Sequence, residues 1–439
     1  MRVLQTMCLL FIIAGSASAL DVKFDGNFRT RFYAFVNKDL DFTRNADYWS
    51  LDSRLRLGIT LDITPTFSVY YQLEVGNIPW GELAVGGGLG ADKWNLETKN
   101  MYMDYKDVFW RGKLGIFGFK TPLESELDDD LMGIKLSFNQ PLFSIDVLFS
   151  KLYNGTNDSI SNINDDNDYF EVESWNSTYL YFVNGQLKLD PVNAQVYYMR
   201  VVDDRFAYKY SLNWIGTYNT LKLDPFKLDL GFSLNMGAVV NLGTSIGVSA
   251  YHLYGKAEFE FFGFLKVFVR VNMTSGNDTN HDMIEQFQVA GNHGNFKTDL
   301  GILFGGGPFT QQSYFDYRIV TADPRKNLTR GAIRFDDPGL FVIEFGAEAN
   351  IKEIGLKSTL VAGIAQTAVS VGTNSVTLLG IEFDLHNRFK LDKNVYLYLS
   401  GALLLPGTAL TPVYNISHPT IILGTDIAFK LDGKFEIEF

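Results

Sequence analysis

The sequence predicts an all-β protein in which about 18 antiparallel strands (alternatively about 16) close into a single transmembrane barrel. Three observations predict this fold class. Apolar and polar residues alternate along most of the chain, the N-terminus resembles a secretory signal, and the alternation continues to a terminal aromatic residue, Phe439. A soluble β-sandwich or β-helix would also alternate, because any sheet with two unlike faces does so. The signal and the terminal phenylalanine together favour the barrel.

Residues 1–19 have the features of a secretory signal peptide. Arg2 supplies a positive start, residues 3–13 form an apolar core, and Ala17-Ser18-Ala19 is a small-residue cleavage site. The apolar core is shorter than the roughly 20 residues that a helix needs to span a bilayer. Cys8, the single cysteine, lies inside this segment. The mature chain, 20–439, is therefore expected to form one barrel domain without disulfides.

Composition agrees with a barrel that meets lipid outside and water inside. Aromatic residues make up 15% of the 439 residues, and 40 residues are glycine. Aromatic girdles and a polar lumen are typical of outer-membrane barrels. The net charge is −12, and the sequence contains no basic stripe. Nucleic acid is therefore not an expected partner.

Each candidate strand combines apolar side chains of one parity with polar side chains of the other. In the first, Phe24, Phe28 and Phe32 share a parity that differs from that of Arg29 and Arg31. The pattern predicts strands near residues 23–34, 49–62, 67–75, 99–106, 111–121, 131–139, 141–151, 174–189, 192–202, 207–221, 226–240, 247–262, 264–274, 340–352, 356–368, 375–390, 394–405 and 420–439. A further weak strand could lie within 280–335.

The connections between these segments predict short periplasmic turns and long extracellular loops. Asp190-Pro191 and Asp224-Pro225 lie where the apolar parity flips, so both are predicted to be periplasmic turns. The long polar stretches are 76–98, 152–173, 275–338 and 408–419, and 76–98 is the candidate constriction loop.

The last candidate strand contains a turn-like dipeptide, Asp432-Gly433. Only about six residues follow it, whereas a spanning strand needs roughly 9–11. We therefore expect 420–439 to be one strand, with Gly433 as a bulge or bend. This assignment places Asp426, Lys430, Glu436 and Glu438 on the inner side.

The polar parity of the strands is expected to face the lumen, and its charged residues are the candidate site. Arg29, Arg31, Arg54 and Arg56 fall on neighbouring strands, and Glu74 faces them from the third. Four guanidinium groups on one wall repel one another unless anions or acidic side chains balance them. The remaining candidate lumen and substrate-binding residues are Lys266, Arg270, Glu382 and Asp384, with Lys256, Arg388, Glu344 and Glu348 on the same parity.

Two interpretations of this wall remain open from the residues alone. The arginines could guide an anion, with acidic residues opposite them producing a transverse field. They could equally form an ion-pair network that holds a wide barrel open.

Several short segments resemble the alginate-export family of outer-membrane barrels. The C-terminal match covers residues 379–385, with a Gly-x-Glu-x-Asp strand, and a following strand that ends in Pro406-Gly407. Residues 54–58 and 71–76 resemble the family's N-terminal region, and residues 274–278 resemble its Ala-Ser-Gly-Asp turn. The resemblance implies an arginine-lined lumen that passes a polyanionic polysaccharide, with Arg29, Arg31, Arg54 and Arg56 at the matching positions and Glu74 facing them.

Enzymatic chemistry is not expected. Of the five histidines, His252 and His386 have lumen parity, and neither has an evident nucleophile or acid at a suitable spacing. We expect no catalytic residues, no metal site and no cofactor.

The sequence therefore predicts a channel in a bacterial outer membrane that passes a hydrophilic, anionic solute by passive transport. The first hypothesis is export of an acidic polysaccharide. The alternatives are a general or substrate-specific uptake porin, and a surface adhesin or recognition barrel with a closed lumen. The expected partners are outer-membrane lipid and the solute. The oligomeric state stays open, with a monomer as the expectation.

Overall fold

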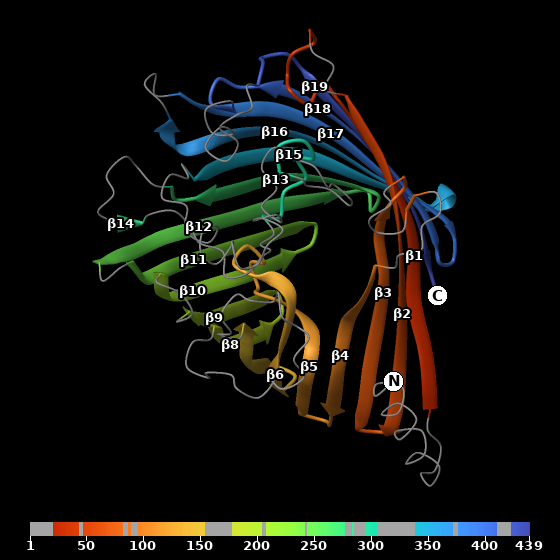
Figure 1. The fold of residues 1–439 in the computed structure, drawn as a ribbon, viewed down its shortest axis with the longest axis vertical. Coiled ribbons are helices and arrows are strands. Elements are labelled where there is room, and N and C mark those ends of the chain that lie inside the picture. Colours follow the sequence, from red (N-terminus) through yellow and green to blue (C-terminus); the bar gives the residue numbers. More distant parts are fainter. Residues whose placement is uncertain are drawn as a thin grey trace.

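Eighteen long antiparallel strands form one closed barrel in the part of the chain that the computed structural model describes (Figure 1). The described residues are 21–43, 47–81, 87–88, 95–153, 178–203, 208–241, 244–276, 283–284, 296–304, 339–371, 376–410 and 423–439. The long strands are β1 (Asp21–Val36), β2 (Tyr48–Thr64), β3 (Phe67–Pro79), β4 (Leu96–Lys106), β5 (Trp110–Lys120), β6 (Asp128–Asn139), β7 (Phe143–Tyr153), β8 (Thr178–Leu189), β9 (Val192–Asp203), β10 (Tyr208–Leu223), β11 (Phe226–Asn241), β12 (Thr244–Phe261), β13 (Leu265–Thr274), β15 (Leu340–Ile351), β16 (Leu356–Val371), β17 (Val376–Asp392), β18 (Val395–Pro406) and β19 (Ala428–Glu438).

Two short elements complete the secondary structure of the described residues. The two-residue strand β14 (Met283–Ile284) pairs in parallel with β12, and the 3-10 helix η4 (Lys352–Ile354) connects β15 to β16. No helix among the described residues is long and apolar enough to cross a membrane.

The first and last strands close the barrel. β1 and β19 pair antiparallel from Asn27 opposite Glu438 to Val36 opposite Phe429. Beyond this ladder, the backbone N–H of Gly26 donates to the carbonyl of Phe439 at 2.9 Å, and the N–H of Phe439 donates back at 3.0 Å. The terminal phenylalanine is therefore the last hydrogen-bonded position of the closing seam, and neither β1 nor β19 is left as an unpaired edge.

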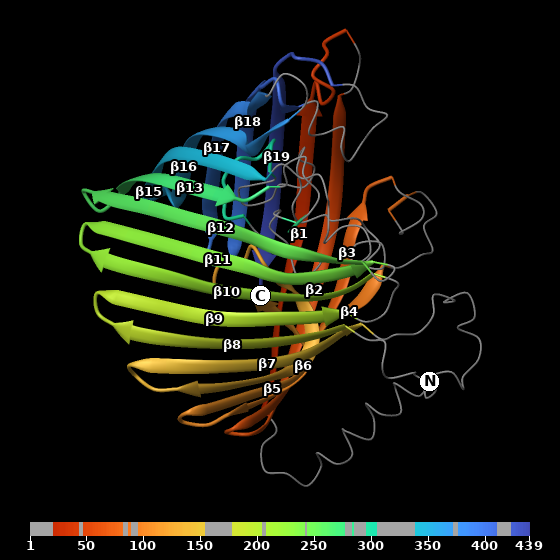
Figure 2. The ribbon, with the colours of Figure 1, turned by 90° about the vertical axis from the view of Figure 1, so that its left-hand side faces the viewer.

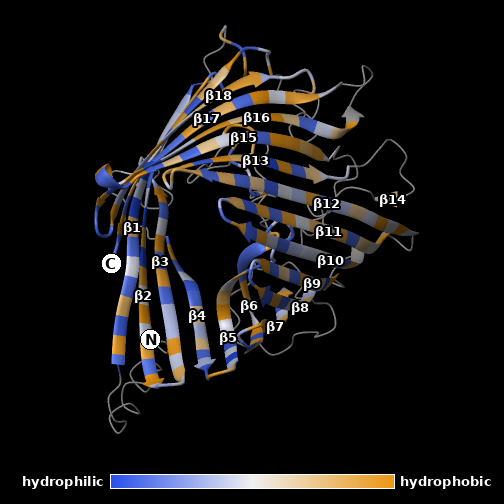
Figure 3. Ribbon diagram, turned by 180° about the vertical axis from the view of Figure 1, so that it is seen from behind, coloured by the Kyte–Doolittle hydropathy of each residue, from blue (hydrophilic) through white to orange (hydrophobic). Residues whose placement is uncertain are grey.

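Burial on the strands is the reverse of that in a soluble sheet protein. Large apolar side chains such as Leu136, Val196 and Leu431 are exposed, whereas Arg31, Glu382 and Lys430 are buried. Hydropathy alternates residue by residue along the strands in Figure 3. The apolar parity thus forms the outer face, as a lipid-facing barrel requires, and the polar parity forms the inner face.

Connections at the two ends of the barrel differ in length, as the sequence predicts (Figure 2). Both chain ends of the barrel and the two-residue connections Asp190-Pro191 (β8–β9) and Asp224-Pro225 (β10–β11) lie at one end, which we call the turn end. The opposite, loop end carries the connections that span 80–95, 154–177, 275–339 and 407–427. Much of the predicted loop stretches lies outside the described residues, as does the predicted signal 1–19.

All 18 predicted segments correspond to strands, but three details of the prediction are wrong. β19 begins at Ala428 rather than near 420, so Asp426 precedes it, and Gly433 pairs with Phe32 and Leu399 without a register shift. Gly433 is therefore not a bulge. Residues 76–79 belong to β3 and 96–98 to β4, so the candidate constriction loop is shorter than 76–98.

Two chain segments fold against the inner face instead of lying beyond the rim. The first inward segment, Thr121–Leu127, connects β5 to β6, and its Leu123 and Leu127 are buried against strands β5–β12. The second inward segment comprises residues 296–304, whose Leu300, Ile302 and Leu303 are buried against β13, β15–β19 and β1. Apolar clusters on two sides of the lumen thus hold the two segments.

Candidate channel lining

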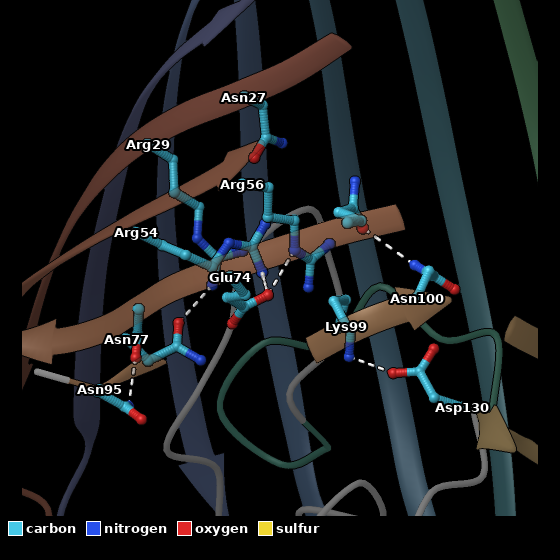
Figure 4. A network of polar contacts seen from close by, with 12 residues as sticks. Asn27, Arg29, Arg54, Arg56, Glu74, Asn77, Asn95, Lys99, Asn100 and Asp130 are labelled. Atoms are coloured by element: carbon cyan, nitrogen blue, oxygen red, sulfur yellow. Dashed lines mark hydrogen bonds and ion pairs between the residues drawn. The ribbon is translucent and has the colours of Figure 1, made fainter. Parts of the chain in front are cut away.

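The candidate arginines lie side by side on the inner face of β1 and β2. Arg29 is directly opposite Arg54 in the β1–β2 ladder, Asn27 is opposite Arg56, and Arg31 is opposite Asp52. Strand pairing therefore brings these side chains together, because directly opposed residues share a face and lie close to one another. Figure 4 shows Arg29, Arg54 and Arg56 gathered around Glu74 from β3.

Two carboxylates balance part of this positive charge. The guanidinium of Arg31 binds Asp52 through Nε at 3.0 Å and through Nη2 at 2.7 Å, and both side chains are buried. Glu74 accepts a hydrogen bond from Nε of Arg56 at 2.5 Å and lies 3.8 Å from Nη1 of Arg54. The two parallel contacts of Arg31 with Asp52 form a bidentate pair, which is strong and well oriented, whereas Arg54 and Arg56 both approach the same oxygen of Glu74.

Arg29 instead contacts a neutral amide, and a bulge in β3 provides it. The β2–β3 register shifts between Ser53 and Leu55, which adds one residue to β3 near Gly76 and Asn77. Asn77 has a φ of 45°, and its Oδ1 accepts from Arg29 at 2.7 Å and from Arg31 at 3.3 Å. Bulges commonly re-aim a side chain beside a functional site. Sequence parity did not identify Asn77, because the bulge breaks the alternation from which parity is read.

The arginine group therefore carries surplus positive charge. Among the described residues, Arg31, Arg54 and Arg56 share two carboxylates, Asp52 and Glu74, while Arg29 contacts the amide of Asn77. The Nε atoms of Arg29 and Arg54 are buried and have no hydrogen-bond partner there. Buried donors are normally satisfied by protein, water or ligand, so these two positions suit an acceptor from the lumen.

The basic surface continues across the closing seam onto β17–β19. Arg388 lies 4.3 Å from the ring centroid of Tyr396, and Lys434 lies 4.0 Å from that of Tyr398. Lys434 is opposite Arg31 in the β1–β19 ladder, and its Nζ contacts Glu436 at 2.6 Å. Cations stacked on tyrosine rings thus extend the arginine group sideways.

Glu382 and Asp384, which were expected to line the open lumen, instead bind a chain segment inside the barrel. Glu382 accepts the backbone N–H groups of Ile302 at 2.5 Å and Leu303 at 2.9 Å, and Asp384 accepts that of Gly301 at 3.0 Å. These carboxylates hold the second inward segment rather than line an open wall. Because only β18 and β19 separate β17 from β1, the two carboxylates also do not form the expected acidic wall opposite the arginines.

Arg270 belongs to the same attachment. It binds Glu344 through Nη1 at 2.6 Å and Asp299 of the second inward segment through Nη2 at 2.9 Å. Glu344 also accepts the N–H of Asp299 at 2.9 Å. Lys266 lies apart from this group, close to the β12–β13 turn, where it is half-exposed and 3.6 Å from Glu260.

The first inward segment is fixed by a hydrogen-bonded serine and histidine. Strand parity placed His252 on the lumen face but did not identify Ser125 as its partner. Ser125 Oγ lies 2.7 Å from Nδ1 of His252, and Nε2 of His252 lies 3.2 Å from Oδ1 of Asn272. Glu126 accepts from Tyr197 and from Thr121 in the same cluster. Ser125, His252 and Asn272 are all buried, so no solute reaches the serine hydroxyl. The arrangement holds the segment to β12 and β13.

His386, the second histidine with lumen parity, has a similar attachment role. Its Nδ1 contacts Ser400, and its Nε2 lies 3.0 Å from the carbonyl oxygen of Asp299. No group of three or more histidine, cysteine or acidic residues among those described is arranged to hold a metal ion.

Comparison with solved structures relates the fold to outer-membrane proteins of Pseudomonas aeruginosa. OprD matches with a TM-score of 0.55 and 10% identity over 97% of each chain. OccK8 (OprE) matches with a TM-score of 0.55 and 13% identity, over 95% of this chain and 98% of that one. The outer membrane protein opdK matches with a TM-score of 0.51 and 9% identity, over 95% and 99%. No family model matches the sequence, and no curated protein does so.

These identities show the fold alone: an 18-stranded antiparallel barrel of the bacterial outer-membrane type. The fold class and the predicted location in an outer membrane agree with this result. The resemblance to the alginate-export family is not supported, because the matching solved structures belong to a different group of barrels.

Proposed function

We propose that the chain is a passive outer-membrane uptake channel for a small, hydrophilic, anionic solute. The strands exclude lipid, the two inward segments narrow the lumen, and the arginine group lowers the electrostatic cost of an anion in transit. The fold shared with the outer membrane protein opdK supports a porin-like channel over polysaccharide export.

The observation that carries the proposal is the opposition of Arg29 and Arg54 on the inner face. A cross-strand pair of like charges is destabilising unless something else is gained from it. Asn77, which contacts Arg29, contributes no negative charge. An anion from the lumen would relieve the repulsion, and the Nε atoms of Arg29 and Arg54, which have no hydrogen-bond partner among the described residues, provide donors for it.

The ion pair of Arg31 with Asp52 indicates that the four arginines have different roles. Their bidentate, buried pair already satisfies both charges. We infer that Arg31 maintains the wall, while Arg29 and Arg54 act on the solute. Both interpretations of the arginine wall, anion guide and ion-pair network, then hold for different members of it.

Flux of a matched pair of solutes tests the proposal. Purified protein would be placed in liposomes that contain radiolabelled gluconate or glucose, which differ in charge but little in size. We expect gluconate to leave faster than glucose, and the preference to fall in the Arg29→Gln/Arg54→Gln double variant. Lys188→Gln, a charge removal at the turn end of β8, should leave it unchanged. Equal rates for the two solutes would contradict the proposal, and impermeable liposomes would support a recognition barrel instead.

A further inference from the structure

The two inward segments come from opposite sides of the barrel wall, yet one side chain joins them. Lys297 of the second segment donates from Nζ to the carbonyl oxygen of Pro122 in the first segment, at 3.1 Å. The same Nζ lies 3.6 Å from Glu124. The neighbouring Phe296 packs against His252, 5.2 Å between ring centroids, and His252 in turn contacts Ser125. The segments therefore meet inside the lumen.

Two aromatic rings complete the surroundings of the Lys297 ammonium. Its Nζ lies 4.3 Å from the ring centroid of Tyr218 on β10 and 5.6 Å from that of Tyr254 on β12. The two rings are 6.2 Å apart and so form adjoining walls. Aromatic faces combined with a carboxylate and a carbonyl oxygen are the chemistry by which proteins recognise organic ammonium ions.

The backbone on both sides of this contact is held in a sparsely populated conformation. Lys297 has a φ of 39° and Glu124 a φ of 67°, both in the left-handed region that side chains other than glycine seldom adopt. Such positions persist only where surrounding contacts over-determine them. Lys297 is thus directed to the rings against its own backbone preference.

We propose that Tyr218, Tyr254, Glu124 and the carbonyl of Pro122 form a binding site for a primary alkylammonium ion, which Lys297 fills as an internal ligand. Filling the site ties the two inward segments together. When the lysine side chain is removed, a soluble alkylammonium of similar length occupies the vacated space and restores the link.

Binding of a free ammonium should be weak. Burial lowers the pKa of Lys297, and the nearby Glu124 carboxylate opposes that shift. The site therefore replaces only part of the hydration that the ammonium loses on entering it. A method suited to weak ligands is needed for the test.

Saturation-transfer NMR with n-butylammonium provides that test on the full-length protein in detergent micelles. Lys297→Gly removes the side chain from the site, and glycine adopts the left-handed backbone conformation of position 297 without strain. Lys297→Met keeps the site filled with an uncharged chain. We expect saturation transfer to n-butylammonium with Lys297→Gly, and little with Lys297→Met or the unaltered protein. The preference of the glycine variant for n-butylammonium over neutral n-butanol should be roughly tenfold.

A matched control removes a second ammonium from the same carboxylate. Lys120 contacts Glu124 at 2.9 Å, its side chain is 58% exposed, and its ammonium group lies over no aromatic ring of the described residues. Lys120→Gly should therefore create no n-butylammonium site. Equal transfer to n-butanol, or equal transfer with the glycine and methionine variants at position 297, would overturn the proposal. If Lys297→Gly does not yield a folded barrel, Lys297→Asn replaces it, because asparagine tolerates the left-handed region.

Discussion

Removing one acceptor of Glu382 should loosen the second inward segment without altering the barrel. Glu382 is fully buried, and its two oxygens accept the N–H groups of Ile302 at 2.5 Å and Leu303 at 2.9 Å. Glu382→Gln keeps the shape of the side chain but replaces one acceptor by an NH₂ donor. One of the two N–H groups then faces another donor.

The size of the shift toward the undocked segment follows from the free-energy cost of an unsatisfied buried hydrogen-bonding group. An unpaired buried N–H costs about 1–3 kcal/mol. The equilibrium between the docked and undocked segment should therefore shift roughly 5- to 150-fold toward the undocked form. Contacts of Asp384, Arg270 and Lys430 with residues 299–301 remain, so docking is weakened rather than abolished.

Single-channel recordings in planar bilayers measure this shift. We expect Glu382→Gln to spend more time in a state of higher conductance, with visible transitions between the two levels. Glu348→Gln is the matched control. Glu348 lies on the inner face of β15, four residues along the strand from Glu344, and it contacts Lys357 of β16 at 2.9 Å instead of the second inward segment. Recordings of Glu382→Gln that match those of the control would refute the role assigned to Glu382.

Two further predictions concern packing and the division of labour among the arginines. Gly363→Ala places a Cβ 2.6 Å from Leu300 Cδ2 of the second inward segment, whereas a Cβ at Gly433 would be 3.7 Å from the nearest atom. Gly363→Ala should therefore weaken docking of the second inward segment by about 1–3 kcal/mol and give the same conductance transitions as Glu382→Gln. Gly433→Ala, the control, should give no such transitions. Arg31→Gln leaves Asp52 buried without its bidentate partner and should cost about 3–5 kcal/mol. Arg29→Gln loses a contact to neutral Asn77, worth about 0.5–1.5 kcal/mol, but it also removes the repulsion from the opposed Arg54, so its cost should not exceed that of the lost contact. Urea unfolding of protein refolded in lipid vesicles measures the difference, and equal losses would contradict the assignment.

The strands could be predicted because each carries its own signal. Alternation along β1, for example, depends only on the residues of β1, and lipid outside and polar groups inside impose it on every strand. The same logic placed Arg29 and Arg54 on one face, since neighbouring strands with defined parity must share an inner wall.

Features that depend on contacts between distant parts of the chain could not be predicted in this way. Parity identified Glu382 as a lumen residue, but its partners lie about 80 residues away in sequence. Asn77 was missed because a bulge shifts the pattern locally.

The inward segments have a recognisable sequence signal: apolar residues within otherwise polar connections. Leu123 and Leu127 interrupt an otherwise polar, acidic connection, and residues 300–304 form an apolar run within the long stretch 275–338. Apolar residues in a loop that should face water indicate that the loop packs against something. Here both segments pack against the inner wall.

Reversal potential in a KCl gradient tests the central claim, that Arg29 and Arg54 make the lumen selective for anions. The unaltered protein should show a reversal potential of the sign given by chloride permeation. Arg29→Gln and Arg54→Gln should each reduce it, the double variant should reduce it further, and Lys188→Gln should leave it unchanged. A cation-selective channel, or a reversal potential that the double variant does not alter, would contradict the account.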